Sequence, residues 1–219
     1  MKLFIDTANM QEIRDGARLG VISGVTTNPS LAAMEGIGNR ENYRAAVQEI
    51  SDILDGPISV EVVSLEAEGM VAEGREIAEW IPNPWVKIPS TVAGFEAIAT
   101  LAKDGIKVNQ TLCFSLNQAL LGAQAGSFVV SPFVGRLDDI GQQGMDLVED
   151  IVSVFRQQKI ETQVLAASVR TSLHCSQAAR AGAHIATVPY KVLLQMVQHP
   201  LTDSGVSRFL SDWGKAGNS

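Results

Sequence analysis

The sequence lacks several features, and each absence excludes a class of protein. Of its 219 residues only two are cysteines, Cys113 and Cys175, which lie in apolar-rich segments and match no metal-site spacing. We therefore expect reduced core thiols rather than a disulfide. No apolar run approaches the roughly 20 residues of a membrane-spanning helix, and Asp6 ends the first apolar run well before a secretory signal would end. These absences predict a soluble, cytoplasmic protein.

Positive charge is also scarce. The chain has 17 Lys and Arg residues against 24 Asp and Glu residues, which gives a formal net charge of −7. An acidic protein is a poor partner for nucleic acid or for an anionic membrane surface, so we expect neither. An anionic small molecule is compatible with this charge where a few cations converge in a site.

Short β-like runs alternate with helix-length amphipathic runs along the whole chain. Apolar residues keep i, i+3, i+4 spacing from Tyr43 to Leu54, from Ala67 to Ala78 and from Met145 to Phe155. Strands are expected at residues 2–7, 24–28, 58–63, 85–90, 106–112, 127–133, 162–168 and 184–189. Eight such units predict an α/β fold, the (β/α)8 TIM barrel. A doubly wound open sheet is the alternative, but Asp6-Thr7-Ala8-Asn9 is not the glycine-rich loop that should follow its first strand.

A further apolar stripe follows the last expected barrel helix. His199-Pro200 interrupts the chain before it. The positions of the stripe are Val206, Phe209, Leu210 and Trp213. We expect residues 1–219 to form a single barrel domain, with residues 201–215 as a C-terminal helical arm that opens after Thr202-Asp203. The arm either folds back over the outer helices or docks on a neighbouring subunit, and we favour the neighbour.

One lysine lies inside a strand-length apolar run, Trp85-Val86-Lys87-Ile88-Pro89-Ser90. An apolar run of this kind is typical of a strand covered on both faces. Desolvation disfavours an ammonium there, and a buried free amine is the nucleophile that attacks a ketone or aldehyde carbonyl to form a Schiff base. The alternative is that Lys87 extends its stem past the strand and keeps its charge in solvent.

Polar residues end seven of the eight expected strands. In a parallel barrel the carboxyl ends of all strands meet at one face, where barrel enzymes hold their active sites. The residues at these ends are Asp6, Thr26, Thr27, Asn28, Glu61, Lys87, Asn109, Thr111, Ser131, Arg136, Ser168 and Arg170. This combination of one lysine, two carboxylates, two arginines, amides and hydroxyls predicts an active site.

The predicted ring supports carbon–carbon bond cleavage through an iminium. Lys87 would form the iminium with C2 of a ketose, and the iminium would accept the electrons of the C3–C4 bond. Asp6 or Glu61 would take the proton of the C4 hydroxyl. Glu61 with Thr111 would hold the water that moves protons during imine formation and hydrolysis.

The two arginines suit a terminal phosphate. Arg136 and Arg170, with Ser168, would supply charge-assisted hydrogen-bond donors. The alternative for the arginines is a structural ion pair over the barrel mouth. The alternative for Asp6 is a capping role at the start of the first helix.

Six motifs, spread over essentially the whole chain, carry a resemblance to a known family. They are Phe4-Ile5-Asp6-Thr7-Ala8-Asn9, Gly24-Val25-Thr26-Thr27-Asn28-Pro29-Ser30, Val86-Lys87-Ile88-Pro89, Asn109-Gln110-Thr111-Leu112, Ser131-Pro132-Phe133-Val134-Gly135-Arg136 and Ala167-Ser168-Val169-Arg170. In this order they resemble the transaldolase family, in particular its short-chain subfamily, which also contains the fructose-6-phosphate aldolases. The resemblance implies a (β/α)8 barrel, sugar phosphates as substrates, and a homo-oligomer (pentamer or decamer) whose C-terminal helix contacts a neighbouring subunit.

The resemblance also implies a role for each site residue. Lys87 would form the Schiff base, Asp6 would act as acid and base at the C4 hydroxyl, and Glu61 and Thr111 would surround a catalytic water. The substrate-binding residues would be Thr26, Asn28, Asn109, Ser131, Phe133, Arg136, Ser168 and Arg170. We expect no metal and no organic cofactor, because the iminium serves as the electron sink.

Two positions favour transfer over cleavage. The resemblance implies that aldolase-type members have glutamine where this chain has Glu61 and tyrosine where it has Phe133. A phenol can help to protonate and release the dihydroxyacetone enamine, whereas phenylalanine cannot. We therefore expect a transaldolase of the pentose phosphate pathway that moves a dihydroxyacetone unit from fructose 6-phosphate or sedoheptulose 7-phosphate to erythrose 4-phosphate or glyceraldehyde 3-phosphate. The alternatives are a fructose-6-phosphate aldolase that releases free dihydroxyacetone, and a catalytically silent sugar-phosphate-binding protein.

Overall fold

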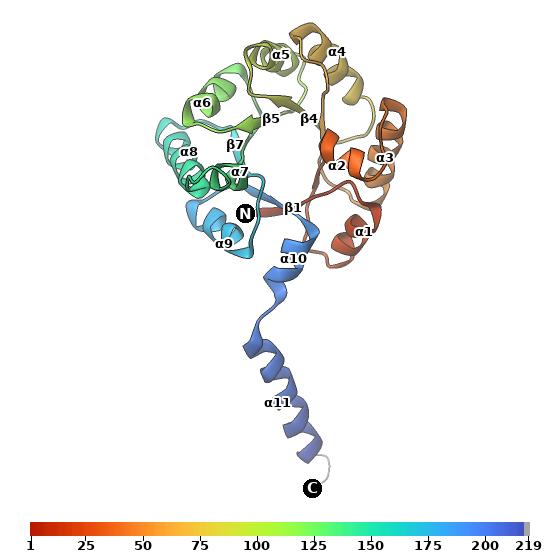
Figure 1. Ribbon diagram of the computed structural model, residues 1–219, viewed down its shortest axis with the longest axis vertical. Helices are drawn as coiled ribbons and strands as arrows, with labels where there is room; N and C mark the ends of the chain where they lie inside the picture. The colour runs from red at the N-terminus through yellow and green to blue at the C-terminus, as the bar shows by residue number, and fades with distance from the viewer. Residues whose placement is uncertain (217–219) are drawn as a thin grey trace.

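Eight parallel strands close into a barrel in the computed structural model, which describes residues 1–216 (Figure 1). Each strand pairs with the next along the chain, and β8 pairs with β1. The strands are Lys2–Asp6 (β1), Val25–Thr26 (β2), Ile58–Glu61 (β3), Pro84–Pro89 (β4), Val108–Cys113 (β5), Val129–Pro132 (β6), Gln163–Ala166 (β7) and Ile185–Val188 (β8). The predicted (β/α)8 barrel is confirmed, and the open doubly wound sheet is wrong.

Seven of the eight strands are shorter than the sequence predicts, and β2 keeps the smallest share of its expected length. It has two residues instead of the expected 24–28. Asn28 leaves the ladder because its side chain caps the following helix, where Oδ1 accepts a hydrogen bond from the Leu31 N–H at 2.9 Å. Polar residues at the carboxyl end of a strand are thus used for caps and for the cavity described below.

Helices surround the barrel as an outer ring, and one further helix at the C-terminal end extends away from it (Figure 1). They are Met10–Arg18 (α1), Pro29–Met34 (α2), Arg40–Ile53 (α3), Ala67–Ile77 (α4), Val92–Lys103 (α5), Leu116–Ala125 (α6), Val134–Asp138 (α7), Gly144–Gln158 (α8), Ser172–Ala181 (α9), Tyr190–Val197 (α10) and Pro200–Ala216 (α11). The short helices α2 and α7 are additions that the sequence pattern does not predict. Within residues 1–216, no helix combines the length and the apolarity that crossing a membrane requires.

Capping residues determine where several helices begin and end. Thr91, Ser115 and Thr171 each accept a hydrogen bond from a backbone N–H three residues later, at the starts of α5, α6 and α9. Gly126 and Gly182 follow α6 and α9 with φ values of 99° and 86°. Only glycine adopts this left-handed conformation without strain, so it ends the helix there.

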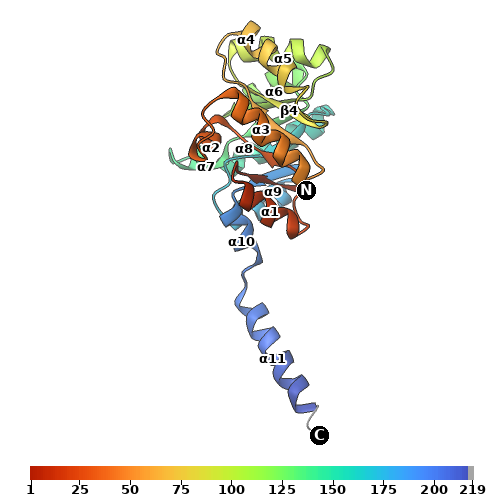
Figure 2. The ribbon, with the colours of Figure 1, turned by 90° about the vertical axis from the view of Figure 1, so that its right-hand side faces the viewer.

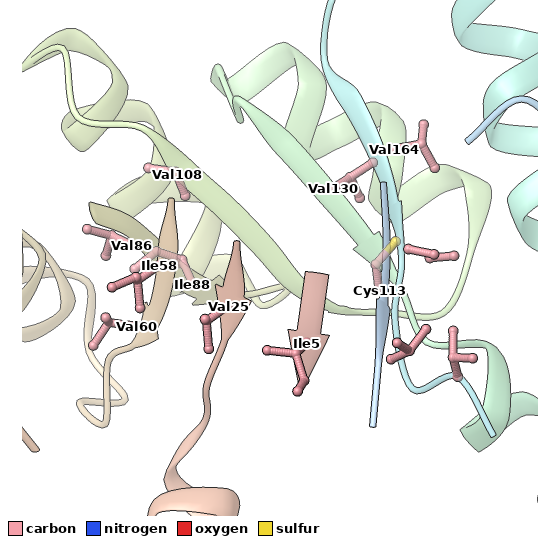
Figure 3. Close-up of a cluster of buried hydrophobic side chains, with 14 of the residues drawn as sticks. Ile5, Val25, Ile58, Val60, Val86, Ile88, Val108, Cys113, Val130 and Val164 are labelled. Atoms are coloured by element: carbon pink, nitrogen blue, oxygen red, sulfur yellow. The ribbon is translucent and has the colours of Figure 1, made fainter. Parts of the chain in front are cut away.

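The strands are buried on both faces, which explains their apolar composition. Outward side chains such as Val25, Ile58 and Val86, from neighbouring strands, belong to the main core between barrel and helices (Figure 3). A smaller cluster fills the barrel interior with Phe4, Trp85, Val129, Leu165, Ala167 and Ile185. Because side chains alternate along a strand, Lys87 lies on the same inner face as Trp85. The sheet pleat therefore turns this lysine inward.

Both cysteines are buried free thiols, as the sequence predicts. Burial raises the pKa of Cys113 to about 12. Its thiol therefore remains protonated at neutral pH, and it behaves as a small apolar core residue.

The C-terminal helix α11 extends away from the barrel and buries none of its residues (Figures 1 and 2). Its apolar stripe is exposed, with Phe209 73% and Trp213 81% accessible. The alternative in which the arm folds back over the outer helices is therefore wrong. The helix also begins earlier than expected, at Pro200 rather than after Thr202-Asp203, because the fixed φ of proline suits the first helical position.

Candidate active site

A cavity of about 430 Å³ lies at the carboxyl ends of the strands. Every predicted site residue except Glu61 lines it: Asp6, Thr26, Asn28, Lys87, Asn109, Thr111, Ser131, Phe133, Arg136, Ser168 and Arg170. A volume of this size suits a small-molecule ligand. Among the described residues, no group of three or more His, Cys, Asp or Glu side chains is arranged to hold a metal ion.

Lys87 lies in the cavity wall between two polar neighbours on adjacent strands. In the sheet it is paired with Glu61 of β3 and with Asn109 of β5. Its Nζ is 3.1 Å from Glu61 Oε2 and donates a hydrogen bond to the Thr27 carbonyl oxygen at 3.0 Å. Only 6% of the Lys87 side chain is exposed. The alternative in which the lysine keeps its charge in bulk solvent is wrong.

The contact with Glu61 changes the expectation about the charge on Lys87. Burial alone favours the free amine, but an adjacent carboxylate favours the ammonium. The two side chains therefore form a buried ion pair, in which each partner compensates the other's desolvation. The Glu61 carboxylate is thus within reach of a proton on the Lys87 nitrogen.

Asp6, the second carboxylate, has a different environment. Burial raises the pKa of Asp6, and this effect outweighs the positive charge of Lys87 and the Thr26 hydrogen bond, which lower it. The Thr26 hydroxyl donates to Asp6 Oδ1 at 2.6 Å. Asp6 does not cap α1, because Asn9 does so by accepting from the Glu12 N–H at 3.0 Å. The capping alternative for Asp6 is wrong.

Thr187 is a cavity residue that sequence reasoning missed. Thr187 lies on β8 and Thr26 on β2, the two strands that flank β1. The two hydroxyl oxygens are 2.6 Å apart. The Thr26 hydroxyl has one hydrogen, which it gives to Asp6, so Thr187 donates to Thr26. The three side chains form a chain that orients the Asp6 carboxylate. The available signal was a polar residue at an inward-facing position near the end of the eighth strand.

Asn109 and Ser131 are joined in a buried network. The Ser131 hydroxyl donates to Asn109 Oδ1 at 2.6 Å, and Asn109 Nδ2 donates to Ser59 Oγ at 3.0 Å. The network holds the Asn109 amide beside Lys87. Ser59, which sequence reasoning also missed, lies on the same strand face as Glu61, two residues earlier.

Thr111 presents a buried hydroxyl to the cavity. The β5–β6 register shifts between Gln110 and Cys113, and Leu112 has a φ of 52°. A bulge of this kind re-aims neighbouring side chains. Thr111 Oγ1 has no hydrogen-bond partner within residues 1–216, and in particular it makes no direct bond with Glu61. Its shared role with Glu61 at a water stays a prediction.

The two arginines have different partners. Arg170 Nη2 is 2.8 Å from Asp139 Oδ2, which is the ion pair that the structural alternative describes. Arg136 makes no ion pair with any residue in the described part of the chain, and its guanidinium lies 5.5 Å from the ring centroid of Phe133. Arg136 is therefore the arginine whose hydrogen-bond donors are more readily available to an anion.

A close approach between two loops brings both arginines to the same side of the cavity. The Gly135 N–H donates to the Ser168 carbonyl at 2.9 Å, and a Cβ at Gly135 would meet that oxygen at 2.3 Å. Ser168 itself has a φ of 56°, a strained conformation for a residue with a side chain. The absence of a side chain at Gly135 therefore allows the loops after β6 and β7 to lie together.

With its cavity at the carboxyl ends of eight parallel strands, the protein has the architecture of a (β/α)8-barrel enzyme. The family model described as Transaldolase/Fructose-6-phosphate aldolase matches residues 3–219. The chain belongs to this family.

Several relatives are similar over nearly their whole length, and each is named "Probable transaldolase". The protein of Dehalococcoides mccartyi is 58% identical over 214 residues, covering 97% of this chain and 98% of the relative. That of Heliobacterium modesticaldum is 59% identical over 213 residues, covering 97% of both. That of Thermoanaerobacter sp. is 57% identical over 217 residues, covering 99% of both.

Asp6→Asn is expected to make the variant gain stability relative to the wild type as pH rises. Folding raises the pKa of the Asp6 carboxyl. The protonated group therefore stabilises the folded state fully at pH values below the pKa of the unfolded chain, roughly 3.9. This contribution to stability is lost as the pH rises through the pKa of the folded state. Thermal unfolding measured at several pH values from 4 to 8 checks this. If the wild type instead gains stability relative to the variant as the pH rises, the effect of the Lys87 charge on the Asp6 pKa outweighs that of burial.

An exposed carboxylate provides the matched control for this measurement. Asp55 lies on the surface, where a carboxylate is hydrated in the folded and in the unfolded chain. Asp55→Asn should therefore leave the pH dependence of unfolding as it is in the wild type.

Proposed function

We propose that the protein is a transaldolase that carries a dihydroxyacetone unit as a Schiff base on Lys87. The observation that carries the proposal is the position of the Lys87 amine, which lines the cavity 3.1 Å from one carboxylate and within the electrostatic influence of a second, Asp6. Family membership and the printed names of the relatives support the same reaction class.

The first step is attack of the Lys87 amine on C2 of a ketose phosphate. Glu61, which contacts the lysine, takes the ammonium proton and so frees the lone pair. The carbon–nitrogen bond forms, and the former carbonyl oxygen takes one proton from the nitrogen and a second from the protonated Glu61. It then leaves as water, and an iminium remains. The buried hydroxyl of Thr111 supplies a hydrogen-bond partner for that water.

The second step breaks the C3–C4 bond. Asp6 takes the proton of the C4 hydroxyl, the C4 oxygen becomes the carbonyl of the departing aldose, and the bonding electrons move to the iminium to give an enamine. Burial raises the pKa of Asp6, which makes its carboxylate a stronger base toward this proton. An acceptor aldehyde then reverses the step, and hydrolysis of the new iminium frees Lys87.

The proposed donors are fructose 6-phosphate and sedoheptulose 7-phosphate, and the proposed acceptors are erythrose 4-phosphate and glyceraldehyde 3-phosphate. These are substrates of the pentose phosphate pathway in the cytoplasm. The two reduced thiols fit that reducing compartment.

Lys87→Met should abolish turnover and covalent trapping. Borohydride added with fructose 6-phosphate reduces the iminium, so mass spectrometry of the wild type should find the adduct on Lys87. Since the methionine leaves Glu61 buried without its partner, the double variant Lys87→Met/Glu61→Gln tests the same loss without an isolated charge. Lys107 immediately precedes β5 and so lies at the amino ends of the strands, away from the cavity, with its ammonium over the Phe128 ring. Lys107→Met is therefore the matched control, and its adduct on Lys87 should form as in the wild type. An adduct on another lysine would refute the proposal.

Arg136→Ala should raise KM for phosphorylated donors about 10- to 100-fold, the loss expected for a hydrogen bond to a charged group. The same change should leave KM for unphosphorylated dihydroxyacetone donors nearly unchanged. Arg14→Ala on α1, which removes an arginine paired with Glu49, is the control. Equal effects on both kinds of donor would remove Arg136 from the phosphate site.

Glu61 and Phe133 support transfer over the aldolase alternative. The carboxylate of Glu61 forms an ion pair with the lysine, which a glutamine could not do. The ring of Phe133 lies between Phe114, at 5.7 Å, and the guanidinium of Arg136, and it offers no proton to the enamine. The enamine is thus expected to persist until an acceptor aldehyde arrives.

Phe133→Tyr combined with Glu61→Gln should raise the release of free dihydroxyacetone relative to transfer. Product analysis with fructose 6-phosphate, with and without erythrose 4-phosphate, measures the ratio. Phe114→Tyr, which adds a phenol to the neighbouring ring, is the matched control and should leave the ratio unchanged. A wild type that continues to release dihydroxyacetone without an acceptor is the aldolase, and sugar phosphate binding without any turnover indicates the silent binding protein.

The exposed helix α11 is proposed to dock on a second copy of the chain, in a pentamer or decamer. The large apolar side chains of its stripe have no covering element in the described chain, and a patch of this kind marks an interaction surface. Phe209→Asp with Trp213→Asp should reduce the assembly size in analytical ultracentrifugation. A wild type that sediments as a monomer would contradict this part of the proposal.

A further inference from the structure

Tyr43 lies on α3, outside the barrel, yet its hydroxyl reaches the strand ends that hold Lys87. The phenolic oxygen is 2.7 Å from Thr27 Oγ1 in a buried contact. The backbone carbonyl of the same Thr27 accepts the hydrogen bond from Lys87 Nζ at 3.0 Å. One residue therefore separates the tyrosine hydroxyl from the lysine nitrogen.

The direction of the hydrogen bonds follows from the number of hydrogens. The Thr27 hydroxyl donates its one hydrogen to the Ser59 carbonyl oxygen at 2.8 Å. Tyr43 must therefore be the donor in its bond with Thr27. The contact links α3, the end of β2 and β3 in one sequence of bonds, and β3 is the strand that ends with Glu61.

The environment keeps the tyrosine protonated. Burial raises the pKa of Tyr43 to about 12. The phenol is thus a constant hydrogen-bond donor at any working pH, and it has no part in proton transfer.

The packing of the ring does not depend on the hydroxyl. Tyr43 lies edge-on to Trp80 with ring centroids 6.1 Å apart, and a phenylalanine would keep that contact. Tyr43 and Glu61 also line a second cavity of about 340 Å³, beside α2 and α3, so the outer face of this strand end is not filled by other side chains. The hydroxyl is the group that ties α3 to the strand ends at this point.

We propose that Tyr43 is a positioning residue for Lys87: by donating to Thr27 from α3, it fixes the carbonyl that receives the Lys87 Nζ and the strand end that carries Glu61. It touches neither substrate nor the reacting atoms. The inference rests on the proposed Schiff-base function, because its effect is on the lysine that forms the adduct.

Tyr43→Phe should slow borohydride-trapped adduct formation with fructose 6-phosphate about tenfold, the factor that corresponds to one lost hydrogen bond. The KM for phosphorylated donors should stay within about twofold of the wild type, because the arginines at the cavity are untouched. The effect should appear in kcat. A role in stability alone would lower the melting temperature and leave the trapping rate unchanged.

Thr162→Val is the matched control for a lost buried hydroxyl. The Thr162 hydroxyl donates to the Ser127 carbonyl at 2.9 Å, before the start of β7 and thus at the amino end of the barrel. It should lower the melting temperature without slowing trapping. If Tyr43→Phe and Thr162→Val trap at the same rate, the positioning role is wrong.

Variants at Thr27 keep the test decisive even if Tyr43→Phe folds poorly. Thr27→Val removes the acceptor of the tyrosine hydroxyl and should slow trapping, whereas Thr27→Ser keeps it and should restore the rate. Since Tyr43 acts through Thr27, the double variant Tyr43→Phe/Thr27→Val should be no slower than Thr27→Val alone. Additive effects would contradict the proposal.

The wild type separates the two proposals. If no adduct forms on Lys87 in the wild type, the Schiff-base function is wrong, and the positioning role of Tyr43, which rests on it, is wrong too. If the wild type forms the adduct and Tyr43→Phe forms it at the same rate, the function stands and the positioning role is refuted.

Discussion

A pair of opposite charges buried inside the barrel is the interaction on which the site depends. Lys87 and Glu61 lie on adjacent strands, 3.1 Å apart and almost without solvent contact. Either charge alone would be costly there, since burying a single unpaired ion costs about 3–5 kcal/mol. The pair also places a carboxylate beside the nitrogen that loses a proton in the proposed Schiff-base mechanism. One contact thus stabilises both charges and supplies the base that the proposal requires.

Two carboxylates in one site have different properties because their surroundings differ. Glu61 has the lysine as its direct partner, while Asp6 is buried with a threonine hydroxyl, and burial raises its pKa. The difference separates the carboxylate that pairs with Lys87 from the carboxyl that accepts the Thr26 hydroxyl, and under the proposed mechanism it gives the two groups different roles. Thr187, one residue further along the hydrogen-bond chain, holds Asp6 in place.

The barrel divides its interior into a packed apolar end and a polar end. Phe4 and Trp85, with ring centroids 5.5 Å apart, fill the interior below the lysine, and the cavity opens only beyond them. The loops after β6 and β7 add Arg136, Ser168 and Arg170 to the cavity wall, and they meet closely because Gly135 has no side chain. Outside the barrel, α3 contributes a hydroxyl from Tyr43 to the same strand ends. The strand ends that form the site therefore contact the apolar cluster inside the barrel and the helix α3 outside it.

The sequence by itself determined the order of strands, the barrel, the buried lysine and the polar strand ends, because strand-length apolar runs, helical spacing and strand–helix alternation are local patterns. It missed α2, α7 and the strand lengths, which depend on caps that compete for the same polar residues. Only the tertiary structure decided that Thr26 meets Thr187, 161 positions away, that Tyr43 reaches Thr27 from an outer helix, and that Arg170 pairs with Asp139. The physical reason is closure of the barrel: it brings the first and last strands together and fixes side-chain contacts that no local spacing encodes. It likewise leaves α11 outside the ring, since a closed barrel has no further edge or face to cover.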